Sequence, residues 1–414
     1  MLGPEYGARM PVADAFDRPR FGNRSLFPDL EARAYLAHAA VSPPPLPVRR
    51  AVIGAVTELG RRGLEASREA TVQRRRLKVK LAELVGGSAD DYGLVGSTTQ
   101  AVAAAALCFP WRRGDKVILV DAEFPANVTP WLRAAELYGL NVAWLPQPLG
   151  RTRAELGEFF EALERELRSG ARLFAASAVQ FQTGLRLPIA ELAACCKRHG
   201  TEIFVDVIQA AGSSPFDVRT AGVDYAAGAA HKWLMGVEGV GYLYVHPDRV
   251  ASLRPVVAGW ASHVDPFSFL VAGAGHLHYD KPIRRSADFV EGGGHAGVAC
   301  AALEAGIDTI AALGTEGIWR HVNAYLDRLE PALCDLGFES ARATDPALRS
   351  CLFSVRPPSF APLPGLYGRL RDRGVACSTP DGWLRFAPHW PNSPEEEVDL
   401  VIEATREALS ELQR

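Results

Sequence analysis

Short apolar runs alternate with amphipathic stretches through the middle of the chain. Runs rich in Val, Ile, Leu and Phe predict strands at residues 92–95, 116–120, 142–145, 172–176, 202–207, 225–230 and 241–245. Between most of them, helical periodicity predicts helices at 98–107, 126–137, 153–167 and 189–199. This alternation indicates a mostly parallel sheet covered by helices on both faces. Side chains that do chemistry are then expected beyond the carboxyl ends of the strands.

The two ends of the chain differ from this middle part. Residues 1–30 are mostly irregular, and one long helical pattern runs from about 48 to 85, where two glycines end it. After residue 295, helical patterns at 297–313 and 315–336 precede short strands at 351–355 and 383–386 and a closing helix at 394–412. The predicted fold class is α/β. It has a large domain over 31–294, with a mostly parallel seven-stranded sheet, and a smaller α+β domain over 295–414 that includes part of 1–30.

Composition narrows the class of protein without identifying it. The 414 residues are 48% hydrophobic and 22% charged, as in ordinary globular proteins. Lys+Arg 45 against Asp+Glu 48 gives a net charge of -3, too balanced to favour a nucleic-acid or membrane-surface partner. The 7 cysteines show neither CxxC spacing nor paired histidines, which argues against a metal site and for a reducing compartment. With no signal-peptide or membrane-span pattern, we expect a cytoplasmic protein.

The most informative stretch is FVDVIQAAG followed by DYAAGAAHKWLMG. Asp206 ends a strongly apolar strand, and Lys232 follows His231 at the end of the next strand. A lysine and an aspartate at one sheet edge can hold pyridoxal phosphate. The lysine forms a Schiff base, and the aspartate stays ionised against the protonated pyridine nitrogen. Gln209 is then placed to donate to the phenolic oxygen. An ordinary buried ion pair explains the same spacing equally well.

A candidate phosphate site lies earlier in the chain. Gly96, Ser97, Thr98 and Thr99 follow a predicted strand and open an alanine-rich helix. Hydroxyls and free N–H groups at a helix N-terminus bind anions. Ser and Thr are also common helix caps, so this signal is weak by itself.

The motifs DVIQ (206–209), HKWLMG (231–236) and GVGYLYV (239–245) resemble the class V group of pyridoxal-phosphate enzymes, which have fold type I. The group includes cysteine desulfurases, kynureninase, isopenicillin N epimerase, small C–S lyases and class V aminotransferases. The resemblance extends from YLAHAAVSP, which begins at Tyr35, to the final helix.

The resemblance implies a set of roles for the cofactor-binding residues. Lys232 is the Schiff-base lysine and moves the proton at Cα. Asp206 pairs with the pyridine nitrogen, and Gln209 contacts the phenolic oxygen. Thr98 and Thr99 hold the phosphate, and His231 lies beside it. Phe124 takes the place of the histidine that stacks on the cofactor ring in cysteine desulfurases. The competing interpretation makes Phe124 a core residue.

The resemblance also implies a substrate site and a partner. Arg385, in RFAPHWPN, is expected to bind the α-carboxylate of a small amino-acid substrate as a bidentate donor. Gly293 and Gly294 lie in a glycine-rich loop that reaches the partner subunit's phosphate in family dimers, so a homodimer with shared active sites is expected. Ala229 and Gly294 stand where the family commonly has hydroxyl residues, which removes two phosphate contacts.

Several other residues are candidates for selecting the substrate's side chain, and each has an equally plain structural explanation. They are His38, Gln180, Phe181, Trp260, His263, Arg284 and His295. Among them, Trp260 and Arg284, together with Arg285, are placed to flank a bulky or anionic side chain.

The reaction type is the least constrained prediction. Cysteine desulfurases need a nucleophilic cysteine on a loop, whereas Cys377 falls early in the short segment 374–385 and is expected to be structural. β-Elimination of the C–S lyase type is favoured, with a class V aminotransferase or an epimerase as the alternative. A non-catalytic scaffold is a remote alternative, supported only by the two lost hydroxyls. A nicotinamide-dependent oxidoreductase is excluded because no GxGxxG opens the first helix.

Overall fold

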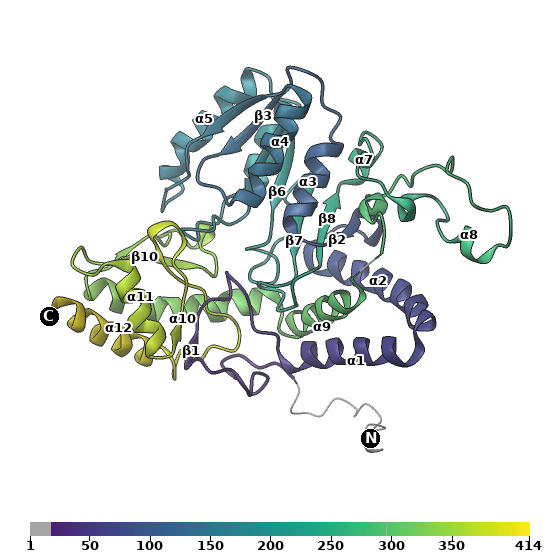
Figure 1. The fold of residues 1–414 in the computed structure, drawn as a ribbon. Helices are drawn as coiled ribbons and strands as arrows, with labels where there is room; N and C mark the ends of the chain where they lie inside the picture. The colour runs from purple at the N-terminus through teal and green to yellow at the C-terminus, as the bar shows by residue number, and fades with distance from the viewer. Residues whose placement is uncertain (1–17, 295) are drawn as a thin grey trace, which may run out of the picture.

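The centre of the protein is a seven-stranded sheet in a computed structural model that describes residues 18–294 and 296–414 (Figure 1). Its strands are β2 (Tyr92–Val95), β3 (Lys116–Val120), β4 (Asn141–Leu145), β5 (Leu173–Ser177), β6 (Glu202–Asp206), β7 (Tyr225–Ala229) and β8 (Gly241–Val245). They lie in the order β2-β8-β7-β6-β5-β3-β4, and only β8 runs antiparallel to its neighbours. The predicted mostly parallel sheet of seven strands is confirmed.

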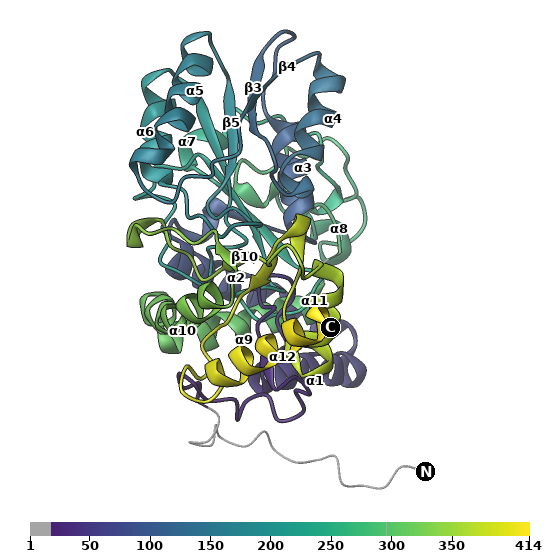
Figure 2. The same ribbon diagram turned by 90° about the vertical axis from the view of Figure 1, so that its left-hand side faces the viewer.

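Helices cover both faces of this sheet, as Figure 2 shows. Helices α3 (Thr98–Cys108) and α4 (Thr129–Tyr138) lie on one face, and α5 (Gly157–Arg168) and α6 (Ile189–Arg198) lie on the other. Because side chains alternate along a strand, Val117 and Leu119 share a buried cluster with α4, whereas Ile118 and Val120 share one with α5. The sheet is therefore buried on both sides, which explains why its strands are nearly continuous apolar runs.

The prediction of one long helix over 48–85 is wrong. The structure has two helices, α1 (Leu46–Arg62) and α2 (Leu64–Val85), that pack against α9 (Gly297–Leu313). Gly63 separates them with φ 52° and ψ −117°, a conformation open to glycine alone. The apolar periodicity continues across the break, so only this glycine signals it.

The predicted helix at 126–137 also starts later than expected. Residues 125–127 form a 3-10 turn, and α4 begins at Thr129 with Pro130 in its first turn. Proline suits a first turn because its missing N–H would have no partner there. The other 3-10 helices are η2 (Ala89–Asp91), η4 (Ala154–Leu156), η5 (Trp260–Ser262), η6 (Ala287–Val290), η7 (Pro346–Leu348) and η8 (Pro380–Gly382).

The C-terminal part combines helices with short strands. Its remaining helices are α10 (Thr315–Asp335), α11 (Leu363–Asp372) and α12 (Val398–Gln413), and β9 (Glu339–Ser340), β10 (Phe353–Arg356) and β12 (Leu384–Phe386) form an antiparallel sheet. Strand β1 (Ala34–Tyr35) pairs in parallel with β11 (Val375–Ala376), so the N-terminal segment adds a strand to this part. The α+β character was predicted; α11, β1, β9 and β11 were not. The domain boundary at residue 294 stays a prediction.

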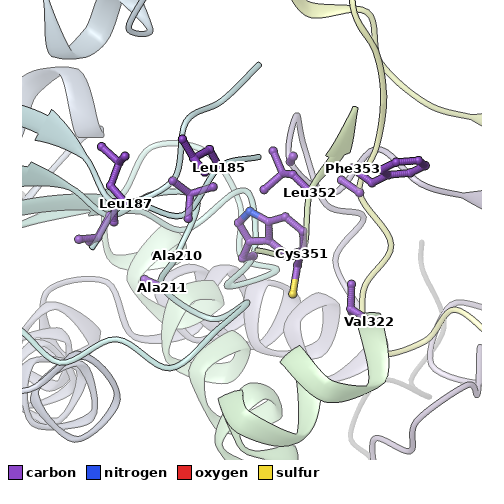
Figure 3. Close-up of a cluster of buried hydrophobic side chains, with 14 of the residues drawn as sticks. Leu185, Leu187, Ala210, Ala211, Val322, Cys351, Leu352 and Phe353 are labelled. Atoms are coloured by element: carbon purple, nitrogen blue, oxygen red, sulfur yellow. The ribbon is translucent and has the colours of Figure 1, made fainter. Parts of the chain in front are cut away.

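A buried apolar cluster joins the two parts of the chain (Figure 3). Leu185 and Leu187, which follow β5, belong to the same buried cluster as Cys351, Leu352 and Phe353. Gly184 allows this close approach, because a Cβ at this position would lie 2.6 Å from the Leu352 carbonyl oxygen. The joint is therefore a continuous core.

A segment between β8 and α9 projects from the body and carries α8 (Ser268–Val271), after the short helix α7 (Pro247–Val250) (Figure 1). Among the described residues, no single helix has the length and apolarity to cross a membrane. Helices α9 and α10 meet those criteria only together, as a pair bent by 74°.

Gly63→Ala should destabilise the protein by about 1–3 kcal/mol, because a Cβ is strained at this backbone conformation. Gly60→Ala is the matched control. It lies inside α1 with open space where a Cβ would stand, and alanine should there stabilise by about 0.5–1 kcal/mol. Urea unfolding of both variants measures the two changes. Equal effects would contradict the assignment of Gly63 as a required helix break.

Candidate active site

Asp206 and Lys232 both lie at the carboxyl edge of the sheet, as predicted. Asp206 is the last residue of β6 and accepts the Ile208 N–H at 2.9 Å, and Lys232 lies in the turn after β7. Burial raises the pKa of Asp206 to about 6, against the opposing effects of that N–H and of Lys232. Burial also lowers the pKa of Lys232 to about 8, against the opposing charge of Asp206. The edge thus holds two desolvated, opposite charges.

Gln209 and the turn around Lys232 are hydrogen-bonded to the N-terminal segment. Gln209 donates through Nε2 to the Ala39 carbonyl at 3.1 Å, and its Oε1 accepts the Trp233 Nε1–H at 2.7 Å. One amide hydrogen of Gln209 remains for another acceptor. The backbone carbonyl of the half-buried His231 accepts a hydrogen bond from the Ser42 N–H. Burial lowers the pKa of the His231 ring, and the nearby charge of Lys232 lowers it further. The predicted roles of Gln209 and His231 at the cofactor stay predictions.

The N-terminus of α3 has one unsatisfied hydroxyl. Thr98 Oγ1 is buried without a hydrogen-bond partner. Ser97 caps the helix by accepting the Gln100 N–H, and Thr99 is exposed. A buried hydroxyl costs free energy unless something satisfies it, and a helix N-terminus favours an anion. Thr98 therefore fits the predicted phosphate site, while Ser97 already acts as a cap.

Phe124 faces the lysine instead of the core. Its side chain is 46% exposed, and Lys232 Nζ lies 5.4 Å from the centre of its ring. The ring also meets Phe181 edge-on, with centroids 5.3 Å apart. The interpretation of Phe124 as a core residue is wrong.

Glu123 is a half-buried residue for which the sequence predicts no role. Its oxygens accept the Ser177 N–H at 2.9 Å and the Ser177 hydroxyl at 2.5 Å. Burial raises the pKa of Glu123 to about 7, the Ser177 hydrogen bonds oppose this, and the charge of Asp206 adds to it. Ala122, just before it, has φ 57°, a strained value for a residue with a Cβ. The sequence signal that could have identified Glu123 is its position as a carboxylate soon after the end of a predicted strand.

Arg385 on β12 is a buried cation with no carboxylate partner among the described residues. It is 5% exposed and donates to Ser378 Oγ at 3.0 Å and to the Phe181 carbonyl at 2.7 Å. Burial lowers its pKa to about 10. A buried guanidinium that binds only neutral groups suits an anionic ligand, and its role at the substrate's α-carboxylate stays a prediction.

Two of the predicted side-chain selectors are held within the protein. Both donors of the Gln180 amide bind Ala122 and Gln182, and its oxygen accepts from Gln182 and Thr183. Gln180 is therefore a turn residue, with no free amide group for a substrate. His38 is buried, with Nδ1 2.8 Å from Ser42 Oγ, and burial holds its pKa well below the usual range.

The residues predicted near the projecting segment are engaged with one another. Trp260, 47% exposed, contacts the rings of Phe267 and Phe269. Arg284 donates to Asp288 at 3.0 Å and to the Ala261 carbonyl at 2.7 Å, so its charge is neutralised within this segment. Further candidates lie near this segment. The His263 ring is hydrogen-bonded to the Lys281 carbonyl, Gly293 lies beside Trp260, and Gly294 and Arg285 are exposed. His295 lies outside the described residues.

Cys377 is structural, as expected. It is 6% exposed, and burial raises the pKa of its thiol to about 12, so little reactive thiolate forms near neutral pH. Among the residues that the structure describes, no three His, Cys, Asp or Glu side chains are grouped to hold a metal ion.

A desolvated lysine opposite a strand-end aspartate, with an anion site at a nearby helix N-terminus, is the arrangement of pyridoxal-phosphate enzymes of fold type I. The aminotransferase class-V family model matches residues 34–355, and the chain belongs to this family. It is therefore an enzyme of a family whose members use pyridoxal phosphate.

Relatives of this chain have different activities. It is 26% identical over 386 residues to the uncharacterized aminotransferase YcbU of Bacillus subtilis (strain 168), covering 93% of this chain and 97% of that protein. It is 32% identical over 181 residues to isopenicillin N epimerase of Streptomyces clavuligerus, covering 44% and 45%. The cystine C–S lyase C-DES, solved with its product cysteine persulfide, has the same fold, with TM-score 0.80, 23% identity and coverage of 92% and 99%.

Glu123→Gln should change the pH dependence of stability. The pKa of Glu123 in the folded protein, about 7, is above its ordinary value of 4.5, so the folded state holds the proton more tightly. The resulting stabilisation is present below pH 4.5 and is lost as the pH rises through about 7. Relative to the variant, the wild type should lose on the order of 3 kcal/mol over this range. Urea unfolding at several pH values measures this loss, and parallel profiles would contradict it.

Proposed function

We propose that this enzyme binds pyridoxal phosphate at Lys232 and catalyses β-elimination from an S-substituted cysteine or a similar amino acid. The observation that carries the proposal is the desolvated pair of Lys232 and Asp206 at the carboxyl edge of the sheet. When bound, the cofactor supplies an electron sink for the charge that develops at the substrate's Cα.

The residues present fit this cofactor. The unpartnered hydroxyl of Thr98 and the N-terminus of α3 suit its phosphate. Asp206, with a pKa of about 6, is mostly ionised at neutral pH and can pair with a protonated ring nitrogen. A pKa of about 8 for Lys232 raises the neutral, nucleophilic fraction of its amine by roughly two orders of magnitude over an ordinary lysine.

Each remaining side chain has a task in this proposal. Arg385 binds the α-carboxylate and orients the substrate, so that the Cα–H points toward the Lys232 amine, which moves the proton. Phe124, whose ring centre lies 5.4 Å from Lys232 Nζ, would contact the cofactor and help to exclude water. Gln209 has one N–H left to donate to the phenolic oxygen.

Elimination is preferred over sulfur abstraction because the described part of the chain has no accessible nucleophilic thiol near Arg385. Cys377 is buried, and the following turn is held by a 2.7 Å hydrogen bond from Gln182 to Asp381. Transamination is the second candidate, supported by similarity to an aminotransferase over nearly the whole chain. A non-catalytic scaffold is disfavoured, because two charges kept desolvated at a sheet edge cost stability unless they serve a function.

The two reactions differ in their need for an acceptor. The enzyme is mixed with S-substituted cysteines and ordinary amino acids, each with and without a 2-oxo acid. The proposal predicts pyruvate, ammonia and a released thiol without any acceptor, and no product from Lys232→Ala. Turnover that strictly requires a 2-oxo acid would refute elimination and support an aminotransferase.

We also propose a homodimer. Apolar side chains on α1 and at the start of α2 are largely exposed: Ile53 (64%), Val56 (53%), Leu59 (51%) and Leu64 (73%). An apolar stripe of this kind on a helix is typical of a surface that a second copy covers. Sedimentation should give twice the chain mass of 44.7 kDa, and Ile53→Glu with Val56→Glu should give the monomer mass. A monomeric wild type would contradict the proposal.

A further inference from the structure

Phe124 and Phe181 form an aromatic wall between the lysine and the carboxylate-binding arginine. Phe124 lies over Lys232 Nζ, at 5.4 Å from the ring centre, and meets the half-buried ring of Phe181 edge-on. The Phe181 carbonyl accepts a hydrogen bond of 2.7 Å from the Arg385 guanidinium. In the proposed function, Lys232 and Arg385 mark the two ends of the substrate backbone. Phe181 therefore lies beside the place where the substrate's side chain begins.

The loops that carry this wall are bound to each other. The Gln180 amide donates to the Ala122 carbonyl at 3.1 Å, and Ser177 binds the Glu123 carboxyl group through both its N–H and its hydroxyl. These contacts connect the residues next to Phe124 with those next to Phe181. The relative position of the two rings is thus determined by partly buried hydrogen bonds, which a specificity surface requires.

The charged groups around the wall are already engaged. Glu123 binds Ser177, and Asp381 binds Gln182. Arg385 is committed to the α-carboxylate, and Asp206 to the ring nitrogen, in the proposed function. An anionic side chain on the substrate would therefore find no free cation among these groups and would lose hydration against the Phe181 ring. An apolar side chain would gain from burial and from edge or stacking contacts with that ring.

We infer that Phe181 determines substrate specificity: its ring packs against the substrate's side chain and selects amino acids with a bulky, uncharged, apolar β-substituent. This inference rests on the proposed function. It assigns Phe124 to the cofactor and Phe181 to the substrate, and it gives S-benzyl-L-cysteine as the type of substrate preferred over S-methyl-L-cysteine and S-carboxymethyl-L-cysteine.

The test uses ligands that carry a carboxylate for Arg385 but no amine that reacts with the cofactor. The dissociation constants of 3-phenylpropanoate, propanoate and succinate are measured by calorimetry on the cofactor-loaded enzyme. We expect 3-phenylpropanoate to bind at least about tenfold more tightly than the other two. Phe181→Ala should remove this difference by weakening 3-phenylpropanoate the most, whereas Phe181→Tyr should preserve the difference. Phe360→Ala, at a phenylalanine that is 42% exposed, is the matched control without effect.

Turnover provides a second readout. Phe181→Ala should lower kcat/KM for S-benzyl-L-cysteine about tenfold, mainly through KM, and should lower it less for S-methyl-L-cysteine. Unchanged cofactor absorbance shows that the variant is folded, and Phe181→Leu replaces it if that absorbance is lost. Equal binding of the three ligands to the wild type, or equal weakening of all three by Phe181→Ala, would overturn the inference while cofactor binding stands. A wild type that takes up no cofactor would overturn the proposed function and the inference together.

Discussion

The site depends on holding a lysine and an aspartate together, out of water, at the carboxyl edge of a parallel sheet. Strands β6 and β7 pair in parallel with Asp206 opposite Ala227, and Lys232 follows in the turn after β7. Desolvation disfavours both charged forms, and the attraction between the two groups opposes it. The balance leaves an ionised carboxylate and a partly neutral amine near neutral pH, which is the chemistry that an aldehyde cofactor requires.

The rest of the fold completes this pair with segments from distant parts of the sequence. The N-terminal segment binds Gln209 through Ala39, α3 presents Thr98, and the C-terminal part delivers Arg385 through β12. The apolar cluster of Leu185 and Leu352 keeps the C-terminal part against the sheet. Because this joint is a packed core, Arg385 keeps a defined position relative to Lys232.

The sequence alone predicts the features of the fold and the site that leave a local or periodic pattern in it. The seven strands, Asp206 and Lys232 follow from apolar runs and from what stands at their ends, and Phe124 was found by resemblance. Contacts between segments were not predictable in this way. The hydrogen bonds between Glu123 and Ser177 join residues at the ends of two strands. The sequence assigns Gln180 to the substrate because it does not reveal the turn in which the Gln180 amide uses all its hydrogen-bonding groups. The break at Gly63 was missed because the helical periodicity runs through it.

The central claim is that Lys232 is the residue that holds the cofactor. It is tested by loading the protein with pyridoxal phosphate, reducing it with borohydride and mapping the modified peptide by mass spectrometry. We expect one phosphopyridoxyl group per chain, on Lys232, and no stable label in Lys232→Ala. Labelling spread over surface lysines, or a wild type that remains unlabelled, would contradict it.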